Sequence, residues 1–243
     1  MIQGWVKNGD VKIHYLDNTS VEEQYIPLII IPGLAESAED YEEMIQSLLP
    51  RRAVVISLRG RGQSDQPTEG YTLEDHVGDI ESVIDAITID KFVMFGFSRG
   101  VSYTLGYAVK HPERIKGLII GDYPAVHTDL KEGWAEFFAS LPDWRGVPIL
   151  QRMSLQTLKS IERESKETSF WEGMQNLKCP LLVIRGGMDG SALSEESVKE
   201  YLAYVPEARV EVMEHSNHDL FTHESKKLMN TIQEFFTNVE GER

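Results

Sequence analysis

The sequence predicts an α/β fold, a doubly wound and mostly parallel β-sheet with helices on both faces. Short runs in which every residue is apolar alternate along the chain with longer segments whose apolar residues recur at helical spacing. Runs that are apolar throughout are typical of strands buried on both faces of a sheet. Strands that alternate with helices at this spacing favour parallel strands joined by crossover helices.

The first 90 residues contain a predicted hairpin, two buried strands and two helices. Apolar residues alternate on either side of Asn8-Gly9, and this dipeptide is a strong hairpin signal that predicts an antiparallel pair of strands. Residues 28–31 and 53–56 are apolar at every position and predict strands buried on both faces. We expect helices over residues 38–49 and 73–87, where apolar residues fall on one face.

The second half of the chain continues the alternation of strands and helices. Three further apolar runs predict strands, and two amphipathic segments predict the helices that cover them. The predicted strands span residues 118–120, 181–184 and 210–213, and the predicted helices span residues 195–204 and 221–236.

The composition is that of an ordinary globular chain. The 243 residues are 41% hydrophobic and 26% charged, which suits one sizeable core. The formal net charge of −15 disfavours nucleic-acid backbones and anionic membrane surfaces as partners. No run approaches the roughly 20 apolar residues of a membrane-spanning helix, so we expect a soluble, cytoplasmic protein. The single cysteine, Cys179, begins an apolar strand and is expected to be a buried structural thiol.

A candidate nucleophile lies in residues 92–100. An apolar run breaks at Gly96, presents Ser98 and reaches Gly100 before a helical pattern begins. Strand, sharp turn and helix in this order form a nucleophile elbow, in which the backbone of the serine is strained and its hydroxyl stands clear of the sheet. Gly96 and Gly100 remove side chains that would strike the neighbouring strand and helix. The following helix directs its free N–H groups and positive dipole end at the site where an oxyanion would form.

Several motifs along the chain resemble those of one superfamily. Their content and their order are similar to those of the α/β-hydrolase fold superfamily, over nearly the whole length. The chain is similar to its single-domain serine hydrolases with a short helical cap. The turn at Ser98 is one of the matching stretches. The others are Pro32-Gly33-Leu34, Arg59-Gly60-Arg61-Gly62-Gln63-Ser64-Asp65, His111-Pro112-Glu113-Arg114, Cys179-Pro180 through Asp189, and Asn217-His218.

The resemblance implies that His218 is the base. A serine hydroxyl needs a base to take its proton, and the base needs an acid that holds it in one tautomer. Such groups gather at the carboxyl ends of parallel strands, so the candidates are the residues of loops that directly follow strands. His218 lies in such a loop, where the family carries its base, and Asn217 takes the place of a frequent glycine. His215 in the same loop is the rival, and the other histidines are interpreted as surface or cap residues.

Two aspartates compete for the position of the acid. Asp189 follows a predicted strand through a glycine-rich turn, which is the usual place in the family and gives the chain order Ser, Asp, His. Asp122 ends the preceding strand and could reach the same imidazole from one strand over. If Asp122 has no part in catalysis, we expect it to cap a helix or a turn at the start of the cap region. We favour Asp189 and keep Asp122 as the alternative, whereas Asp219 is expected to cap the last helix.

The oxyanion site requires two backbone N–H donors aimed at the developing negative charge. The N–H of Arg99, directly after the nucleophile, is one candidate. In the family the other donor follows a His-Gly pair, which is Pro32-Gly33 in this chain, so the resemblance implies the N–H of Leu34. The side chain of Arg99 could orient an anionic substrate, but we favour a structural salt bridge.

Other kinds of site are disfavoured. Residues 59–65 are glycine-rich and basic, but they lack the Lys-Ser/Thr ending and the following helix of a phosphate-binding loop. His215 and His218 have the spacing nearest to that of metal ligands, without a third ligand close in sequence. We therefore expect neither a metal nor another cofactor.

Residues 123–176 interrupt the alternation at the point where this superfamily inserts a helical cap. They contain short amphipathic pieces and three of the four tryptophans, which argues against a disordered linker. We predict a core of residues 1–122 and 177–243 and a helical cap of residues 123–176. The side chains expected to line an apolar pocket under this cap are those of Tyr123, Trp134, Phe137, Phe138 and Trp144.

The resemblance and the motifs together favour a serine hydrolase that acts on a small carboxylic ester or a lactone. Ser98 would attack the carbonyl, His218 would carry the proton, and Asp189 would orient His218. A serine nucleophile disfavours dehalogenase and epoxide-hydrolase chemistry, which in this fold resembles attack by an aspartate. One alternative is hydrolytic carbon–carbon cleavage, in which Arg99 or Arg152 would bind an acidic substrate. The other is a ligand receptor or signalling protein that retains a slow triad.

Overall fold

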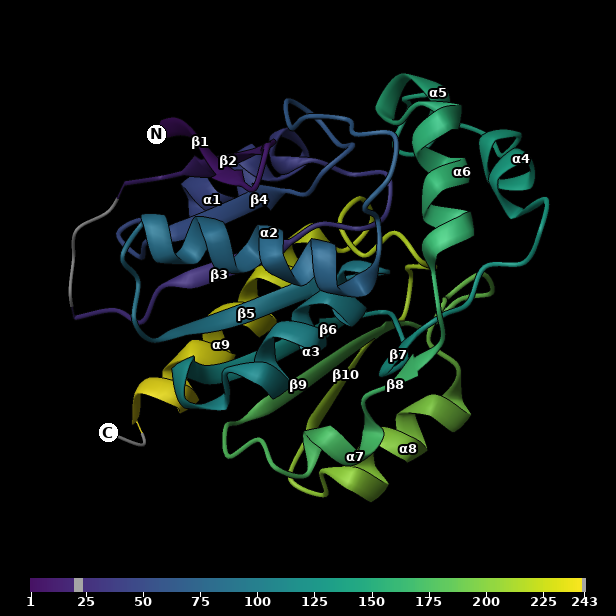
Figure 1. The fold of residues 1–243 in the computed structure, drawn as a ribbon. Coiled ribbons are helices and arrows are strands. Elements are labelled where there is room, and N and C mark those ends of the chain that lie inside the picture. Colours follow the sequence, from purple (N-terminus) through teal and green to yellow (C-terminus); the bar gives the residue numbers. More distant parts are fainter. Residues whose placement is uncertain (20–23, 242–243) are drawn as a thin grey trace.

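The computed structural model describes residues 1–19 and 24–241, and these residues form a layered α/β structure (Figure 1). Within them, eight strands form one sheet in the order β1-β2-β4-β3-β5-β6-β9-β10. β2 pairs antiparallel with β1 and with β4, and all other neighbours in this sheet are parallel, so the predicted doubly wound, mostly parallel sheet is confirmed. The strands are β1 (Ile2–Asn8), β2 (Val11–Asp17), β3 (Leu28–Ile31), β4 (Ala53–Ser57), β5 (Phe92–Phe97), β6 (Ile115–Gly121), β9 (Leu181–Gly186) and β10 (Arg209–Met213).

The N-terminal hairpin forms as predicted, but its turn is displaced by one residue. Asn8 pairs with Val11, so Gly9 and Asp10 are the two residues of the turn. Gly9 has a φ of +60°, which a residue without a Cβ adopts readily.

The helices of the main body follow the predicted segments with shifts at their ends. Thr72 caps α2, because its side chain accepts a hydrogen bond from the N–H of Asp75 at 3.1 Å. The last helix begins four residues later than predicted, because Asp219 holds a turn by accepting from the N–H of Phe221 at 3.0 Å. Within the described residues, no helix is both long and apolar enough to cross a bilayer. The elements are η1 (Ala38–Tyr41), α1 (Glu42–Ser47), α2 (Leu73–Ala86), α3 (Gly100–Lys110), η2 (Pro112–Arg114), α8 (Glu195–Tyr204) and α9 (Ser225–Gly241).

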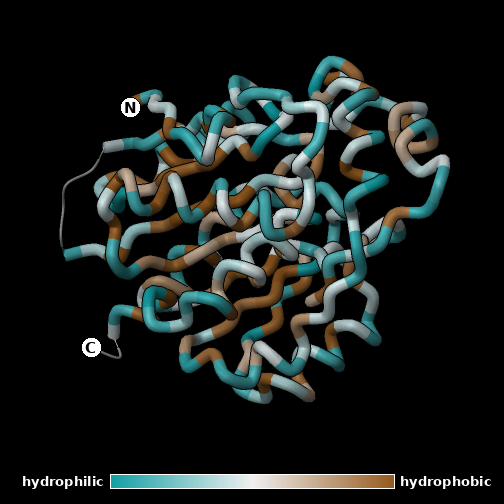
Figure 2. The backbone as a smooth tube through the Cα atoms, in the orientation of Figure 1, coloured by the Kyte–Doolittle hydropathy of each residue, from teal (hydrophilic) through white to brown (hydrophobic). Residues whose placement is uncertain are grey.

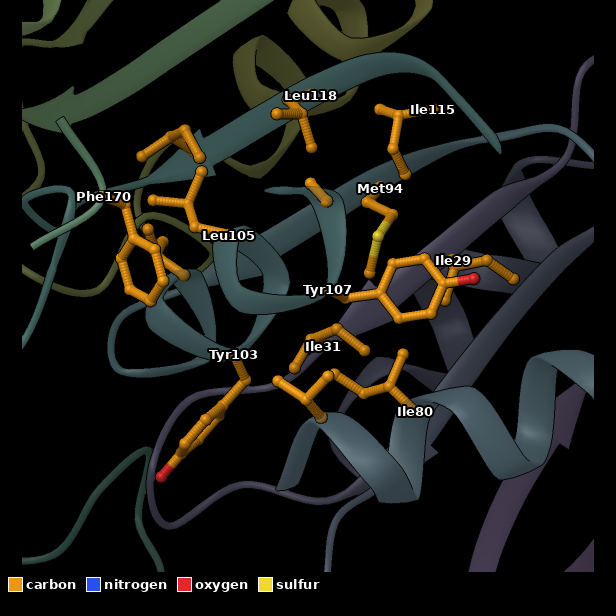
Figure 3. Packing of buried hydrophobic residues seen from close by; sticks show 14 of the residues in the cluster. Ile29, Ile31, Ile80, Met94, Tyr103, Leu105, Tyr107, Ile115, Leu118 and Phe170 are labelled. Atoms are coloured by element: carbon orange, nitrogen blue, oxygen red, sulfur yellow. The ribbon is translucent and has the colours of Figure 1, made fainter. Parts of the chain in front are cut away.

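The two faces of the sheet are covered by different helices. In β5, Phe92 and Met94 pack with α2 and α3, whereas Val93 and Phe95 pack with α1 and α9. Figure 3 shows the first of these clusters around Met94, and in Figure 2 the hydrophobic colour is concentrated along the strands. Because successive side chains of a strand point to opposite faces, a strand buried on both faces must be apolar at every position.

The order of the strands places a crevice next to β3. The chain passes from β3 to β4 on one side and then returns to form β5 on the other side of β3. In open α/β sheets, ligands bind outside the carboxyl ends of the strands at such a reversal. The carboxyl end of β3 leads to Leu34, and that of β5 leads to Ser98. Both predicted parts of the site therefore meet at this crevice.

The segment between β6 and β9 carries a separate group of helices. Three of them, α4, α5 and α6, lie together beyond one end of the sheet (Figure 1), and we call them the cap. Their buried side chains form a cluster that also contains Leu34 and Tyr71 of the main body. The segment leaves and returns at one place, because β7 pairs antiparallel with β8. The elements are β7 (Val126–His127), α4 (Trp134–Ala139), α5 (Ile149–Arg152), α6 (Leu155–Glu164), β8 (Thr168–Ser169) and α7 (Trp171–Met174).

The last helix of this segment, α7, packs on the main body. The ring of Trp171 lies edge-on to Tyr201 of α8, with 4.8 Å between the ring centroids. Phe170 and Trp171 belong to the same buried cluster as Met94. These aromatic residues therefore contribute to the main core and not to the cap.

Gly100 should be intolerant of any side chain. A Cβ on Gly100 would lie 2.3 Å from the carbonyl oxygen of Pro32 and 2.4 Å from that of Ile31. Because backbone atoms cannot move aside cheaply, we expect Gly100→Ala to lower the free energy of unfolding by about 3 kcal/mol or more in urea titrations. Gly146→Ala is the control, because a Cβ there meets no atom within 4 Å and only its φ of +75° opposes the change, which corresponds to about 1 kcal/mol. Equal losses in the two variants would contradict the packing explanation.

Candidate active site

Ser98 occupies a strained turn between β5 and α3. Its φ is +52°, a left-handed conformation that is uncommon for residues other than glycine. The turn is held because the N–H of Ser98 donates to the carbonyl oxygen of Gly121 at 2.7 Å. A Cβ on Gly96 would lie 2.5 Å from Oγ1 of Thr104 and 2.8 Å from Cα of Val101. Close packing of β5 against α3 therefore explains the first glycine of the motif, as Gly100 explains the last.

His218 lies between Ser98 and a carboxylate. Its Nε2 is 2.8 Å from Oγ of Ser98, and its Nδ1 is 2.7 Å from Oδ2 of Asp122. A carboxylate accepts hydrogen bonds, so Nδ1 carries the proton and Nε2 is free to accept the proton of the serine hydroxyl. The ring of His218 is further held by stacking on Phe97, with 5.1 Å between the ring centroids.

Asp122 is fully buried and its carboxylate is fixed by four donors. One donor is Nδ1 of His218. The others are the N–H of Gly186 at 3.0 Å, the hydroxyl of Ser191 at 2.6 Å and the N–H of Ala192 at 2.8 Å. Asp122 directly follows β6 and has a φ of +50°, like Ser98 after β5. Two neighbouring strands therefore end in the same unusual turn, and this brings their two side chains to one histidine.

The structure corrects the choice of the acid, because Asp122 and not Asp189 contacts His218. Asp189 is exposed in the turn after β9. The N–H of Met188 donates to the carbonyl oxygen of Ser216 and holds this turn against the loop after β10. The chain then returns past Asp122 and supplies two of the donors to its carboxylate. The glycine-rich turn therefore supports the acid and does not provide it. The rival base, His215, is also exposed, and its N–H donates to Glu224.

The two candidate oxyanion donors lie on the same cavity as Ser98 and His218. Leu34 and Arg99 both line this cavity. In the described part of the chain, neither backbone N–H has a hydrogen-bond partner. A carboxylate orients the loop of the first donor, because Oε2 of Glu36 accepts from the N–H of Gly33 at 2.8 Å.

The cavity has a volume of about 460 Å³ and mainly apolar walls. Four of the five predicted pocket residues line it, namely Tyr123, Trp134, Phe138 and Trp144. Phe137 does not, and its side chain is 61% exposed. In α4, Phe137 and Phe138 are consecutive and point about 100° apart on the helix. Of these two residues, Phe138 therefore faces the cavity and Phe137 does not. Trp134, one turn earlier on the helix, faces the cavity as well.

A partly buried ion-pair network beside the cavity was not predicted. Glu36 accepts from the hydroxyl of Tyr41 at 2.6 Å and from Nε1 of Trp144 at 2.7 Å. The guanidinium of Arg145 pairs with Glu36 at 3.0 Å and with Asp219 at 3.3 Å. This network links the loop after β3, the cap and the histidine loop. Its sequence signal is weak, because single charged residues in three separate loops show no spacing that relates them.

The side chain of Arg99 points into a second buried network. Its guanidinium donates to the hydroxyls of Tyr103, Thr128 and Ser165 and to Nε2 of His127, at distances between 2.6 and 3.2 Å. All these partners are neutral, so the predicted salt bridge of Arg99 is wrong. These partners and the Thr128 carbonyl oxygen engage each nitrogen of the guanidinium, so a substrate in the cavity would have to compete with them.

Two buried histidines are kept neutral beside arginines. Burial, aided by the charge of Arg99, lowers the pKa of His127 to about 3. Burial, together with the charge of Arg61, lowers the pKa of His76 well below its usual value. Nε2 of each imidazole lies within hydrogen-bond distance of an arginine. The neutral form is required there, because a protonated imidazole cannot accept a hydrogen bond.

Comparison with known proteins identifies the family of this chain. Residues 26–151, which are 126 of the 243 residues, match the model of the alpha/beta hydrolase fold family. The fold and the turn at Ser98 agree with this match. The protein therefore belongs to the α/β-hydrolase fold family, as the motifs predict.

Individual relatives are distant. A provisionally named 2-succinyl-6-hydroxy-2,4-cyclohexadiene-1-carboxylate synthase of Bacillus subtilis (strain 168) is 21% identical, over 87% of this chain and 90% of that protein. A cis-3-alkyl-4-alkyloxetan-2-one decarboxylase of Shewanella oneidensis is 27% identical over 63% of this chain and 44% of that protein, so the alignment spans less than half of its length. Among solved structures, an esterase from Exiguobacterium antarcticum has a TM-score of 0.79 at 20% identity, covering 97% of this chain and 100% of that chain. This last likeness shows a shared fold.

The neutral state of His127 predicts how stability depends on pH. Its pKa is lowered in the folded chain, so its contribution is present above the unfolded value of about 6.5 and is lost as the pH falls towards 3. We expect His127→Gln to reduce the slope of the unfolding free energy between pH 6 and 4 by up to about 1.4 kcal/mol per pH unit. Urea titrations at several pH values measure this slope. His223→Gln, at an exposed position, is the control, and an equal effect of both substitutions would contradict the assignment.

Proposed function

We propose that this protein is a serine hydrolase that cleaves a small, neutral carboxylic ester or lactone through an acyl-enzyme on Ser98. The observation that carries this proposal is the hydrogen-bonded series from Ser98 through His218 to Asp122, which opens on an apolar cavity. In this series each group has the neighbour that its chemical role requires.

Each step of the reaction has a candidate group in this site. Oγ of Ser98 attacks the carbonyl carbon while its proton passes to Nε2 of His218, and Asp122 stabilises the imidazolium through Nδ1. The N–H groups of Leu34 and Arg99 donate to the negative oxygen of the tetrahedral intermediate. His218 then protonates the leaving alcohol, which departs from the acyl-enzyme. Water, deprotonated by the same histidine, attacks the acyl group, and collapse of the second intermediate releases the acid and restores Ser98.

The walls of the cavity favour a neutral substrate with an apolar acyl group. Leu34, Trp134, Phe138 and Trp144 contribute apolar surface, and a cavity of about 460 Å³ suits a small molecule. The solved esterase shares the fold, and the name of the Shewanella protein refers to a four-membered lactone. A lactone is a cyclic ester, which is one of the two substrate classes proposed.

Carbon–carbon cleavage of an acidic substrate has less support. It would require a free cation at the cavity, but Arg99 is engaged by neutral partners and Arg145 by two carboxylates. Arg152 donates to both oxygens of Asp40 at 2.7 and 2.9 Å. All three arginines therefore have partners that an acidic substrate would have to displace.

Hydrolysis of simple esters tests the proposal. We expect turnover of p-nitrophenyl acetate, butyrate or octanoate, and loss of this turnover in Ser98→Ala, because no other group would form the acyl-enzyme. The preferred chain length measures the acyl portion of the cavity. Many turnovers per second indicate an enzyme, whereas slow turnover with a ligand-induced rise in Tm would favour a receptor. Equal rates for Ser98→Ala and the wild type would contradict the proposed mechanism.

The two aspartates give a sharper test of the site. Asp122→Asn removes the acceptor that fixes the tautomer of His218, so we expect kcat to fall by on the order of 10⁴-fold. Asp189→Asn is the matched control, because Asp189 is exposed and Asp122 is the carboxylate that contacts the imidazole, so the kcat of Asp189→Asn should equal that of the wild type. Ester hydrolysis by both purified variants measures the difference. A large loss in Asp189→Asn with normal activity in Asp122→Asn would reverse the assignment.

A further inference from the structure

Two buried arginines stand behind the candidate oxyanion site without a carboxylate partner. The side chains of Arg61 and Arg99 are almost fully buried, with 1% and 3% of their residue surface exposed. Among the described residues, neither guanidinium forms an ion pair with an aspartate or glutamate. A buried charge is costly unless it is compensated. The retention of two such charges beside one cavity therefore calls for a functional explanation.

Arg61 is hydrogen-bonded to the loop that carries Leu34, the first candidate oxyanion donor. Its Nε donates to the carbonyl oxygen of Leu34 at 2.9 Å, and its Nη1 donates to the carbonyl oxygen of Arg59 at 2.7 Å. On the other side of the same loop, Glu36 accepts from the N–H of Gly33. The backbone at Leu34 is thus held between a guanidinium and a carboxylate, which limits its rotation.

A histidine orients Arg61 in turn. Nδ1 of His76 lies 2.7 Å from the carbonyl oxygen of Thr72, which can only accept, so Nδ1 carries the proton. Nε2 of His76 is therefore an acceptor, and it lies 2.8 Å from Nη1 of Arg61. The imidazole also stacks on Tyr103, with 4.2 Å between the ring centroids, and the hydroxyl of Tyr103 accepts from Nε of Arg99.

The backbone next to the second donor is held by a comparable arrangement. The hydroxyl of Ser102 donates to the carbonyl oxygen of Arg99 at 2.8 Å. Oγ of Ser102 must then accept from Nδ1 of His127 at 2.9 Å, which leaves Nε2 of His127 to accept from Arg99. Each candidate donor residue therefore has its carbonyl oxygen fixed by a side chain, and each arrangement includes a neutral histidine.

We propose that Arg61 is a positioning residue of the oxyanion site. It fixes the backbone that presents the N–H of Leu34, and together with Arg99 it places uncompensated positive charge behind the point where the tetrahedral intermediate becomes negative. Fixed donors and charges that need no reorganisation stabilise a transition state more than a substrate. One nitrogen of Arg61, Nη2, has no hydrogen-bond partner within the described chain, so its charge is not fully satisfied by the protein. This inference rests on the proposed ester hydrolysis.

The test compares Arg61→Lys with Arg59→Lys. A lysine at position 61 keeps the charge but cannot donate to several acceptors in the geometry of a guanidinium. Arg59 lies in the same loop, and its side chain pairs with Asp79 on α2, so Arg59→Lys controls for disturbance of the loop. We expect Arg61→Lys to lower kcat for p-nitrophenyl butyrate by about 10- to 100-fold. The KM should be unchanged, and Arg59→Lys should retain the kcat of the wild type.

Binding of butylboronic acid provides a readout that loss of stability alone would not move. Its adduct with Ser98 is tetrahedral and anionic, so its affinity should fall in Arg61→Lys by the same factor as kcat. His76→Phe is the second variant if Arg61→Lys does not fold, because it keeps the stacked ring and removes the acceptor. It should lower kcat and boronic-acid affinity together, by a smaller factor.

The possible outcomes separate this inference from the proposed function. The inference is overturned if Arg61→Lys, or His76→Phe in its place, matches the wild type in kcat and boronic-acid affinity per folded molecule. Equal losses in Arg59→Lys also overturn it, because the effect then belongs to the loop as a whole. If ester turnover does not depend on Ser98, the proposed function fails and the inference fails with it. If turnover depends on Ser98 but not on Arg61, only the inference fails.

Discussion

The close approach of α3 to the end of β3 is the constraint on which the rest of the site depends. Gly100 permits it, because the position of a Cβ there is occupied by the carbonyl oxygens of Ile31 and Pro32. The approach brings the loop after β3 beside the turn at Ser98 and sets the distance between the two candidate oxyanion donors. The left-handed backbone of Ser98 follows from the same packing, since β5 has to turn into α3 within three residues. Ser98 is thus placed by the packing of the core.

Charge around the cavity is divided between two sides. On the side of the cap, the two carboxylates of Glu36 and Asp219 share the guanidinium of Arg145. On the side of α2 and α3, Arg61 and Arg99 have only neutral partners. The cavity itself is apolar, so a negative charge formed at Ser98 would be screened weakly and would be drawn to the uncompensated side. This asymmetry has the sign that ester hydrolysis requires.

The sequence predicted those features that depend on local order along the chain. The strands, the helices of the main body, the turn at Ser98 and the histidine loop all have signals within about ten residues. The sequence favoured Asp189 over the alternative Asp122 because each of them follows a strand, and only the turn of the backbone after β6 directs Asp122 to His218. Phe137 was wrongly assigned to the cavity because consecutive residues of a helix point in different directions. A shift of one residue along the short helix α4 turns a side chain from the cavity to solvent. The network of Glu36, Arg145 and Asp219 joins three distant loops, and no periodicity relates them.

The pairing of β7 with β8 brings the two ends of the cap segment together. The chain leaves the main body and returns to it across this two-stranded ribbon, where Val126 is paired with Ser169 and His127 with Thr168. The loop that carries the helices could therefore be exchanged at the ribbon without moving Asp122, which precedes it. Thr128 and Ser165 lie just inside this junction and bind the guanidinium of Arg99. A transplanted cap of different specificity would have to keep these two hydroxyls, and it would also have to replace the contacts that Trp144 and Arg145 make with Glu36.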